Sequence, residues 1–304
     1  MKIRSLYSTN KLMLSFEVFP PARDGNIKEL LTVVHQLARL KPDFISVTYG
    51  AGGSTQDMSL EIASKIKNNI SLEVLAHLTC VQATKADIAT ILNSFKKRNI
   101  NNVLALRGDP PTGEQVFKKT EGGFGYANEL VEFIKANYNF SIGVAGYPEK
   151  HVEAPNLTTD IENLKRKVDA GADFIITQLF FNNDDFYRFR DMAQNKGIEI
   201  PIIPGIFPIF NYKQIAKIAS LCGANIPNHL NDTLAGVSKD NEEVAKYGTE
   251  YAIRQSQDLL DNGIAGLHFY SMNKSRHVAK IVRELDLNRE EKDEIKKRIT
   301  GGAV

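Results

Sequence analysis

Eight short apolar runs, rich in β-branched and aromatic residues, alternate with amphipathic helical segments along this 304-residue chain. The runs are LSFEVFPP, FISVTYG, LEVLAHLTC, NVLALRGDPP, FSIGVAGYP, FIITQLFF, IPIIPGIFP and GLHFYSMN. Because strands that alternate with helices pair in parallel, eight such units predict an α/β fold, a (β/α)8 TIM barrel. The barrel is predicted to span 1–304 as one domain with a charged helical tail. A doubly wound sheet with an appended helical region fits less well, because no unit has the composition of an interdomain linker.

Local signals predict where several helices begin and end. Thr84 and Asp87 have the spacing of a capping box before the helix that follows the third run. Thr159 is predicted to cap the helix after the fifth run, and Gly171 is predicted to end it. The segment 222–240 is predicted to be irregular, with one short helical turn.

The first run carries a carboxylate at the end of a strand that is otherwise predicted to be buried. Alternation places Leu14, Phe16 and Val18 on one face of this strand and Glu17 on the other. The prolines at 20–21 cannot continue a ladder, so the strand is predicted to end just after Glu17. Burial of an unpaired carboxylate is costly, so Glu17 requires a partner or a function. A partly hydrated edge strand or an internal hydrogen bond is the plain structural explanation.

Polar side chains recur at the same place in successive units. They are Glu17, Thr48, His77, Arg107, Asp109, Tyr147 and Gln178. In a (β/α)8 barrel the carboxyl ends of the strands form the face that carries the active site. Each residue has a structural explanation alone, but a ring of them at one end of the strands predicts an enzyme.

Composition excludes several classes of function. The net charge of +2 gives no support for a nucleic-acid partner. Cys80 and Cys222 lack the spacing of a disulfide framework or a zinc site, so no metal is predicted. The chain lacks a signal-like N-terminus and an apolar run of about 18 residues, which predicts a cytoplasmic protein with no membrane partner.

Motifs in the loops identify no substrate. The chain lacks a P-loop, a nucleophile elbow and a GxGxxG motif, and the glycine-rich segments 50–53 and 122–125 are predicted to be turns. The basic run 165–167 is typical of a solvated helix face, although one member could reach an anion at the barrel mouth. The residues by themselves indicate an enzyme with a carboxylate acid or base in a polar cleft.

A series of longer motifs resembles the methylenetetrahydrofolate reductase family in its short bacterial form. The motifs are SFEVFPP, SVTYGAGGS, HLTC, LALRGDPP, GYPEKHVEA, NLKRKVDAGADFIITQLFF, IPGIFP and HFYSMN, in family order from about residue 12 to residue 285. The resemblance implies a barrel with bound FAD that reduces 5,10-methylenetetrahydrofolate to 5-methyltetrahydrofolate. The implied electron donor is NADH or NADPH, and the implied setting is one-carbon metabolism and methionine supply.

The resemblance also implies roles for individual residues. Glu17 is implied to be the general acid that protonates N10 of the folate, and Asp109 is implied to lie beside the flavin and the pterin. Because a general acid must carry a proton, we expect the apolar neighbours of Glu17 to raise its pKa by desolvation. The implied cofactor-binding residues are Thr48, Tyr49, Ala51, His77, Arg107, Gly108, Asp109, Tyr126, Ala127, Tyr147, His151, Ala154, Asp160, Asn163 and Lys167. The implied substrate-binding residues are Glu17, Asp109, Gln178, Gln214 and Lys274.

Two positions depart from the family pattern. Lys274 stands where close relatives often have arginine, and a lysine cannot form the same bidentate contact with the glutamate carboxylate of a folate. Val152 replaces a proline that is common in the flavin loop. Lys167 is expected on the first turns of its helix, where it could reach the FAD phosphates.

Two other functions fit a folate-binding barrel. A pterin-binding barrel methyltransferase would hold folate but no flavin. A folate- or flavin-binding subunit of a larger complex would use reduced ferredoxin or an electron-transfer partner subunit. For the reductase itself, a homo-oligomer is expected.

Overall fold

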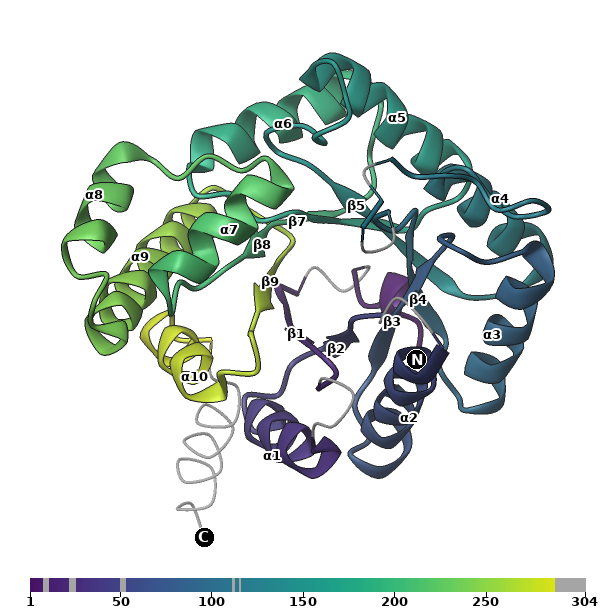
Figure 1. The fold of residues 1–304 in the computed structure, drawn as a ribbon, viewed down its shortest axis with the longest axis horizontal. Helices are drawn as coiled ribbons and strands as arrows, with labels where there is room; N and C mark the ends of the chain where they lie inside the picture. The colour runs from purple at the N-terminus through teal and green to yellow at the C-terminus, as the bar shows by residue number, and fades with distance from the viewer. Residues whose placement is uncertain (8–10, 22–25, 50–52, 111–112, 115, 288–304) are drawn as a thin grey trace, which may run out of the picture.

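The computed structural model describes residues 1–7, 11–21, 26–49, 53–110, 113–114 and 116–287, with side chains omitted for 53–55. A ring of parallel strands lies at the centre, and helices surround it (Figure 1). The strands are β1 (Met13–Val18), β2 (Phe44–Val47), β3 (Val74–Thr79), β4 (Asn102–Leu106), β5 (Ser141–Gly146), β6 (Phe174–Thr177), β7 (Ile202–Ile203), β8 (Gly205–Ile206) and β9 (Gly266–Tyr270). The prediction of a (β/α)8 barrel is confirmed, and the doubly wound alternative is wrong.

The helices mostly fall where hydrophobic periodicity predicts them. They are α1 (Ile27–Ala38), α2 (Gly53–Asn69), α3 (Lys85–Lys97), α4 (Ala127–Asn137), α5 (Leu157–Asp169), α6 (Asn183–Asn195), α7 (Tyr212–Cys222), α8 (Asn228–Gly236), α9 (Asn241–Asp261) and α10 (Ser275–Glu284), with a 3-10 turn η1 (Ile3–Ser5) at the start. The predicted capping box of Thr84 and Asp87 at α3 is confirmed.

Two helix predictions are wrong. The N-cap of α5 is Asn156, whose side chain accepts the Thr159 N–H at 2.9 Å, so Thr159 lies inside the helix. An asparagine caps a helix as well as a threonine does, and the competition between them cannot be resolved locally. The segment 222–240, predicted to be irregular with one short helical turn, contains a longer helix, α8, of 9 residues. Its N-cap Pro227 offers no side-chain hydrogen bond, and burial of Leu230 and Leu234 stabilises it instead.

The seventh predicted strand is split, and the ring closes across this split. The pieces β7 and β8 are separated by Pro204; β7 pairs with β6, and β8 pairs with β9. Proline has no N–H to donate to a ladder, which explains the interruption. The Pro204 carbonyl still accepts the His268 N–H at 3.1 Å, so β9 is also bonded to the break itself.

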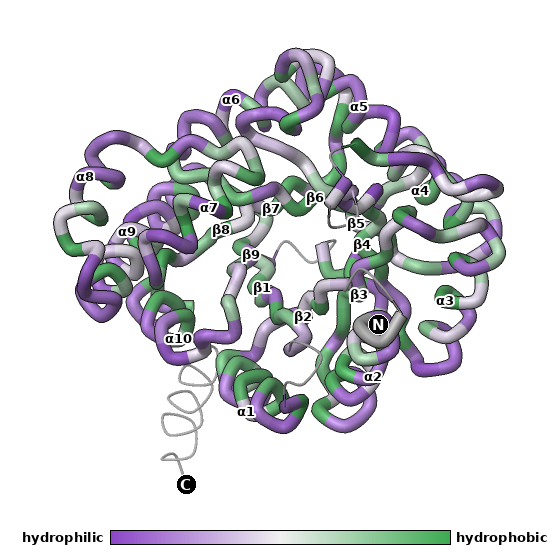
Figure 2. The backbone as a smooth tube through the Cα atoms, in the orientation of Figure 1, coloured by the Kyte–Doolittle hydropathy of each residue, from purple (hydrophilic) through white to green (hydrophobic). Residues whose placement is uncertain are grey.

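Strand alternation separates an apolar outer layer from a polar interior. Leu14, Phe16 and Val18 pack outward in the main core beneath the helices, as predicted, and the helices turn most of their hydrophilic positions to the outside (Figure 2). The interior face of β1 carries Ser15 and Glu17, both buried. The polar interior residues therefore lie within a ring whose outer face is covered by apolar packing against the helices.

The amino-terminal end of the barrel is filled by apolar side chains. Phe44, Leu75 and Phe174 form a separate buried cluster there with Ile3 of η1. The Ile3 N–H donates to Asn102 Oδ1 at 2.7 Å, which fastens η1 across this end. The packed floor leaves the carboxyl ends of the strands as the place where a cavity can form.

Candidate functional site

Two cavities meet at the carboxyl ends of the strands. The mouth cavity, about 420 Å³, lies inside the ring. The side groove, about 410 Å³, runs outward over β4, β5 and α5. Leu106, Arg107, Tyr147 and His151 line both, so the two spaces share a wall.

Most of the predicted site residues line one of these spaces. Those in the mouth cavity are Glu17, Thr48, His77, Arg107, Gly108, Asp109, Tyr147, His151 and Gln178. Those in the side groove are Arg107, Tyr126, Ala127, Tyr147, His151, Ala154, Asp160, Asn163 and Lys167. The prediction that polar strand ends gather at one face is confirmed.

Glu17 lies between two histidines and is only 5% exposed. Its Oε2 is 3.2 Å from His77 Nε2 and 3.7 Å from His268 Nε2. Serine hydroxyls orient both rings: Ser46 Oγ is 2.7 Å from His77 Nε2, and Ser15 Oγ is 2.8 Å from His268 Nδ1. The register produces this group, because Glu17 pairs with Ser46 of β2 and Ser15 pairs with His268 of β9.

The histidines determine the charge state of Glu17. Burial alone would raise the pKa of Glu17, but the attraction of His268 and His77 outweighs it and lowers the pKa to about 2. The expectation of a raised pKa for Glu17 is therefore wrong for this structure. The sequence predicts the desolvation of Glu17 by its own strand. It does not predict the imidazole of His268, which comes from the far end of the chain.

His268 and Tyr270 are site residues that the sequence reasoning missed. They alternate along GLHFYSMN and therefore share a face, which was the available signal. Tyr270 lines the mouth cavity and donates its hydroxyl to the Thr177 carbonyl at 2.7 Å. Within the described residues, His268 Nε2 has no hydrogen-bond partner, although it is buried beside Glu17.

Arg107 separates the two cavities and is held by a carboxylate. Its guanidinium donates to both oxygens of Glu153, at 2.5 and 2.7 Å, and stacks 4.8 Å from the Phe117 ring. This hydrogen-bonded pair raises the pKa of Arg107 and lowers that of Glu153. Glu153 also lines the side groove and was not predicted.

Lys167 and Asp160 lie at the inner wall of the side groove. Lys167 Nζ donates to the Ala145 carbonyl at 2.6 Å and lies 5.8 Å from the Tyr147 ring. Burial lowers the pKa of Lys167 to about 8, and Asp160 partly opposes the change. Asp160 Oδ2 accepts the His151 N–H at 2.9 Å, which fixes the loop above.

The three residues of the basic run 165–167 are placed differently from the prediction. Lys167 lies in the last turn of α5 and not on its first turns, because the helix begins only at Leu157. Lys165 is half-buried and pairs with the exposed Asp169, so the predicted solvated position holds only in part. Arg166, also predicted to be solvated, is exposed but lines the side groove.

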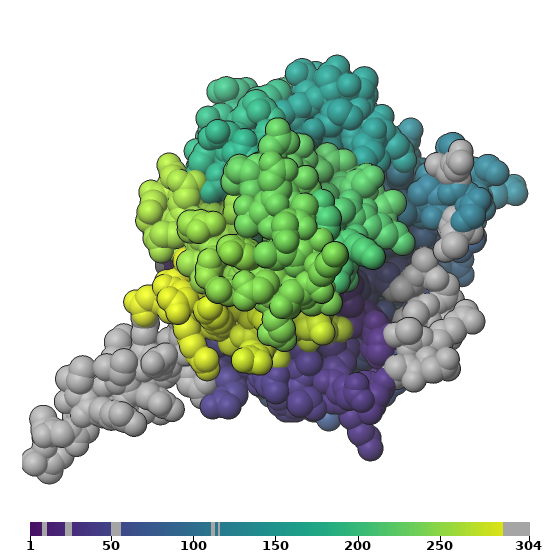
Figure 3. Space-filling view, turned by 60° about the vertical axis from the view of Figure 1, so that its left-hand side comes forward, coloured from purple at the N-terminus to yellow at the C-terminus, as the bar shows by residue number. Residues whose placement is uncertain are grey.

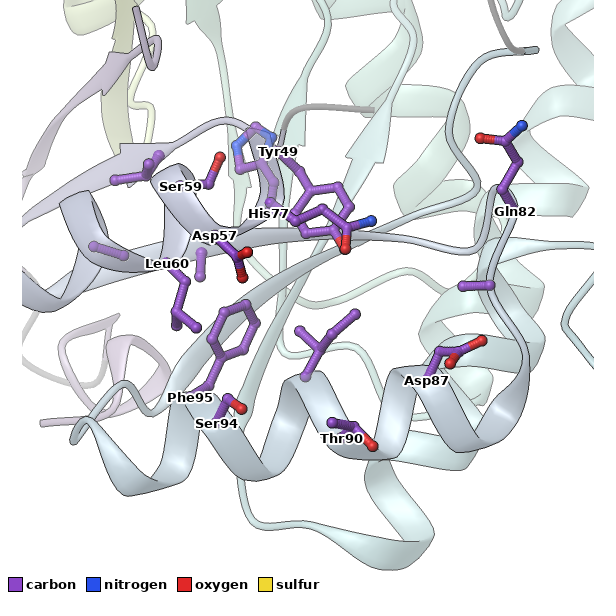
Figure 4. A pocket seen from close by; sticks show the side chains of 16 residues that line it. Tyr49, Asp57, Ser59, Leu60, His77, Gln82, Asp87, Thr90, Ser94 and Phe95 are labelled. Carbon is purple, nitrogen blue, oxygen red and sulfur yellow. The ribbon is translucent and has the colours of Figure 1, made fainter. Parts of the chain in front are cut away.

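Three predicted residues of described placement line neither of these two spaces. Tyr49 lines a third cavity of about 320 Å³ between α2 and α3, which His77 borders at one end (Figure 4). Gln214, in the first turn of α7, and Lys274, the N-cap of α10, are exposed and line neither cavity. Ala51 lies outside the described residues.

Among the residues with described placement, no group of three or more His, Cys, Asp or Glu side chains could hold a metal ion. None of the helices in that same part of the chain is long and apolar enough to cross a membrane.

Known proteins of similar sequence include plant and bacterial methylenetetrahydrofolate reductases. "Methylenetetrahydrofolate reductase (NADH) 1" of Arabidopsis thaliana is 41% identical over 302 residues, which cover 96% of this chain and 51% of the relative. "5,10-methylenetetrahydrofolate reductase" of Escherichia coli is 39% identical over 265 residues, or 87% of this chain and 88% of the relative. The chain thus spans about half the length of the plant relatives that it matches and most of the bacterial ones.

A solved structure shares the fold. An uncharacterized protein from Clostridium thermocellum that binds two copies of 5-methyl-5,6,7,8-tetrahydrofolic acid superposes with a TM-score of 0.65, covering 94% of this chain and 99% of the other. At 14% identity this likeness concerns the fold alone. The sequence profile described as methylenetetrahydrofolate reductase matches residues 2–286. Because that match covers nearly all of the chain, the protein belongs to the methylenetetrahydrofolate reductase family.

Proposed function

We propose that this protein uses FAD to reduce 5,10-methylenetetrahydrofolate to 5-methyltetrahydrofolate with electrons from NADH or NADPH. The observation that supports this most directly is Glu17, buried between His77 and His268 at a cavity that adjoins a cation-lined groove. The names of the relatives describe this reduction, and those of the plant relatives name NADH. The folate-binding neighbour has the same fold.

The residues of the two cavities fit FAD. A dinucleotide has two halves, and the mouth cavity and the side groove are two spaces of similar size with a shared wall. In the side groove, Lys167 and Arg166 offer positive charge for phosphates, while Asp160 and Asn163 offer acceptors for ribose hydroxyls. When bound, FAD would supply the hydride chemistry, which amino-acid side chains cannot perform.

Glu17, assisted by His77, would donate the proton that N10 of the folate requires. With Oε2 and Nε2 3.2 Å apart, the two groups can share one proton. Exclusion of water by a bound folate disfavours the charged carboxylate, so binding would raise the pKa of Glu17 and favour its protonated form. The lowered pKa of Glu17 and its service as an acid are then compatible, because substrate binding changes the environment that sets the pKa.

Asp109 and Gln178 would position and stabilise the folate. Asp109 is exposed at the mouth cavity, where its negative charge would favour the cation that forms when the folate ring opens. Gln178 lines the mouth cavity, and its Oε1 accepts the Leu179 N–H at 2.8 Å, which leaves its amide N–H groups as donors for the folate. Gln214 and Lys274, outside the cavity, would contact the distal part of the substrate.

Anaerobic titration of the purified protein tests the proposal. NADH or NADPH should bleach a bound flavin, and 5,10-methylenetetrahydrofolate should restore the colour with formation of 5-methyltetrahydrofolate. A colourless protein that binds folate would support a pterin-dependent methyltransferase instead. A flavin that pyridine nucleotide cannot reduce would support a subunit that depends on another electron donor.

A further inference from the structure

The turn between β9 and α10 is hydrogen-bonded to the end of β1. The ladder between β1 and β9 stops at the pair Glu17 and Tyr270. Beyond it, the Ser271 N–H donates to the Glu17 carbonyl at 3.2 Å, and the Ser271 hydroxyl donates to the same oxygen. The Asn273 side chain then accepts the Phe19 N–H at 3.0 Å and donates to the Phe19 carbonyl at 2.9 Å. The two ends of the chain meet in this region, and in Figure 3 the yellow surface of α10 borders the purple surface of α1.

The amide of Asn273 takes the place of a neighbouring strand. A primary amide presents an acceptor and a donor side by side, as a peptide group does. The backbone of β9 cannot supply this pair, because the strand ends at Tyr270. Pro20 and Pro21 have no N–H, so Phe19 carries the last backbone donor before the prolines. Removal of the Asn273 amide therefore takes both of these bonds from Phe19.

The turn that carries this amide has an unusual backbone. Met272 and Asn273 both have a positive φ, of 48° and 56°. Such values are uncommon outside glycine and persist where the surrounding contacts enforce them. The Ser271 hydroxyl accepts the Asn273 N–H at 3.2 Å, which supports the turn. A glycine at 273 could adopt this conformation without strain, but it could not form the bonds to Phe19.

The bonded strand end carries two residues of the mouth cavity. Glu17 and Phe19 are two positions apart, so they share a face of the extended chain, and both line the cavity. The contact of 3.2 Å between Glu17 Oε2 and His77 Nε2 depends on where this strand end lies. Asn273 is not part of the cavity lining. It can therefore act on the chemistry only through the backbone that it holds.

We propose that Asn273 is a positioning residue for Glu17 in the reduction of the folate. This inference rests on the proposed function, since it requires Glu17 to donate a proton to the substrate. A proton donor must lie within hydrogen-bond reach of its acceptor. Misplacement by about 1 Å can cost on the order of a hundredfold in rate. By holding Phe19, Asn273 fixes the strand end from which Glu17 reaches both His77 and the folate.

The substitution Asn273→Gly tests the assignment, because it removes the amide and keeps the backbone conformation of the turn. The folate half-reaction should slow by roughly 10- to 100-fold. The affinity for FAD and the reduction of the flavin by pyridine nucleotide should stay near the wild-type values. A variant that reduces the folate at the wild-type rate would overturn the inference and leave the proposed reduction intact.

A double-mutant cycle shows whether the effect passes through Glu17. In the Glu17→Gln background no proton donor is left to position, so adding Asn273→Gly should change the folate half-reaction little. Slowing by the same factor in both backgrounds would overturn the inference. So would a loss of flavin reduction or of FAD in Asn273→Gly, because it would indicate a general structural role.

Asn99→Gly is the matched control. Asn99 also has a positive φ, of 61°, and lies in the turn between α3 and β4, at the opposite end of the strands. This variant loses the hydrogen bond from Asn99 to Asn68, of 3.2 Å, and should reduce the folate at the wild-type rate. An equal slowing in this control would overturn the specific role of Asn273. Absence of folate reduction in the wild-type protein would overturn the proposed function itself.

Discussion

The neighbours of Glu17 explain how a carboxylate can be buried at the end of an apolar strand. A buried charge is tolerated when it is paired and its partners are themselves held by hydrogen bonds. His77 and His268 supply the pairing, and Ser46 and Ser15 hold the two rings. At the residue scale the site is therefore a charge cluster, whose protonation a ligand can change.

Replacing Glu17 by glutamine should separate the two halves of the proposed reaction. Glu17→Gln keeps the shape but removes the proton source, so reduction of the folate should slow by about 10²–10⁴. Reduction of the flavin by pyridine nucleotide needs no acid and should stay near the wild-type rate. Rapid-mixing measurements of each half-reaction, with a thermal melt of the same preparation, check this. Loss of both half-reactions together with a lower melting temperature would indicate a structural role.

The same substitution should reveal a pH-dependent contribution to stability. The pKa of Glu17 is about 2 in the folded protein and 4.5 ordinarily. The ionisation of Glu17 therefore stabilises the fold fully above pH 4.5. This contribution is lost as the pH falls towards 2. The free energy of unfolding in urea should differ most between wild type and Glu17→Gln near neutral pH, and the difference should shrink in acid. A difference that grows on acidification would contradict the assigned pKa.

Lys167→Ala should weaken retention of FAD more than it changes the chemical step. The lysine is half-buried at the wall of the side groove, and a charged hydrogen bond there contributes roughly 1.5–3 kcal/mol. Equilibrium dialysis of the flavin measures the effect. Lys165→Ala, two residues away and outside the lining of the side groove, is the control and should bind FAD normally. Equal affinities in both variants would remove Lys167 from the cofactor site.

At the scale of elements, local caps fix some helices and tertiary packing fixes others. Helix α3 starts at a reciprocal pair, since Thr84 accepts the Asp87 N–H and Asp87 accepts the Thr84 N–H. Helix α8 has no such cap and depends on burial of Leu230 and Leu234 in the core that it shares with α7 and α9. The first kind of helix is visible in a short stretch of sequence, and the second is not.

Thr84→Ala should therefore destabilise the protein without affecting the site. Loss of an N-cap costs about 0.5–2 kcal/mol. Denaturant unfolding of Thr84→Ala measures this cost. Thr90→Ala is the matched control, because Thr90 is exposed in the middle of the same helix and alanine is the better helix former there. Equal stability of the two variants would show that the cap contributes nothing.

At the scale of the whole molecule, the ring depends on a close approach at its last seam. Gly205 begins β8, next to the break at Pro204, and a Cβ there would lie 2.3 Å from the Thr177 carbonyl and 2.7 Å from the Tyr270 ring. Tyr270 also lines the mouth cavity, so closure of the barrel and the shape of the site depend on the same contacts.

Gly205→Ala should lower stability and disturb the mouth cavity together. Overpacking of this kind costs typically about 1–3 kcal/mol. Thermal unfolding and flavin affinity, measured on one preparation, should both fall. Gly236→Ala provides the control, since a Cβ at Gly236 meets nothing within 4 Å. A Gly205→Ala protein as stable as wild type would show that the seam tolerates extra volume.

The sequence by itself determined the barrel and the face on which the site lies. Eight alternating units fix a parallel ring, and the period of two along each strand turns Glu17 and His77 inward, because side-chain direction in a strand is a local property. The motifs also identified the lining of the side groove, including Asp160 and Lys167.

Only the tertiary structure decided the chemistry at Glu17. His268 lies 251 positions further along the chain in sequence, and its approach requires β9 to pair with β1 and close the ring. Desolvation is a property of the strand, whereas the opposing attraction comes from another strand, so the direction of the pKa shift cannot be read from Leu14–Pro21. The length of α8 has the same cause, since it follows from packing between segments that are distant in sequence, whereas the split of the seventh strand follows from Pro204.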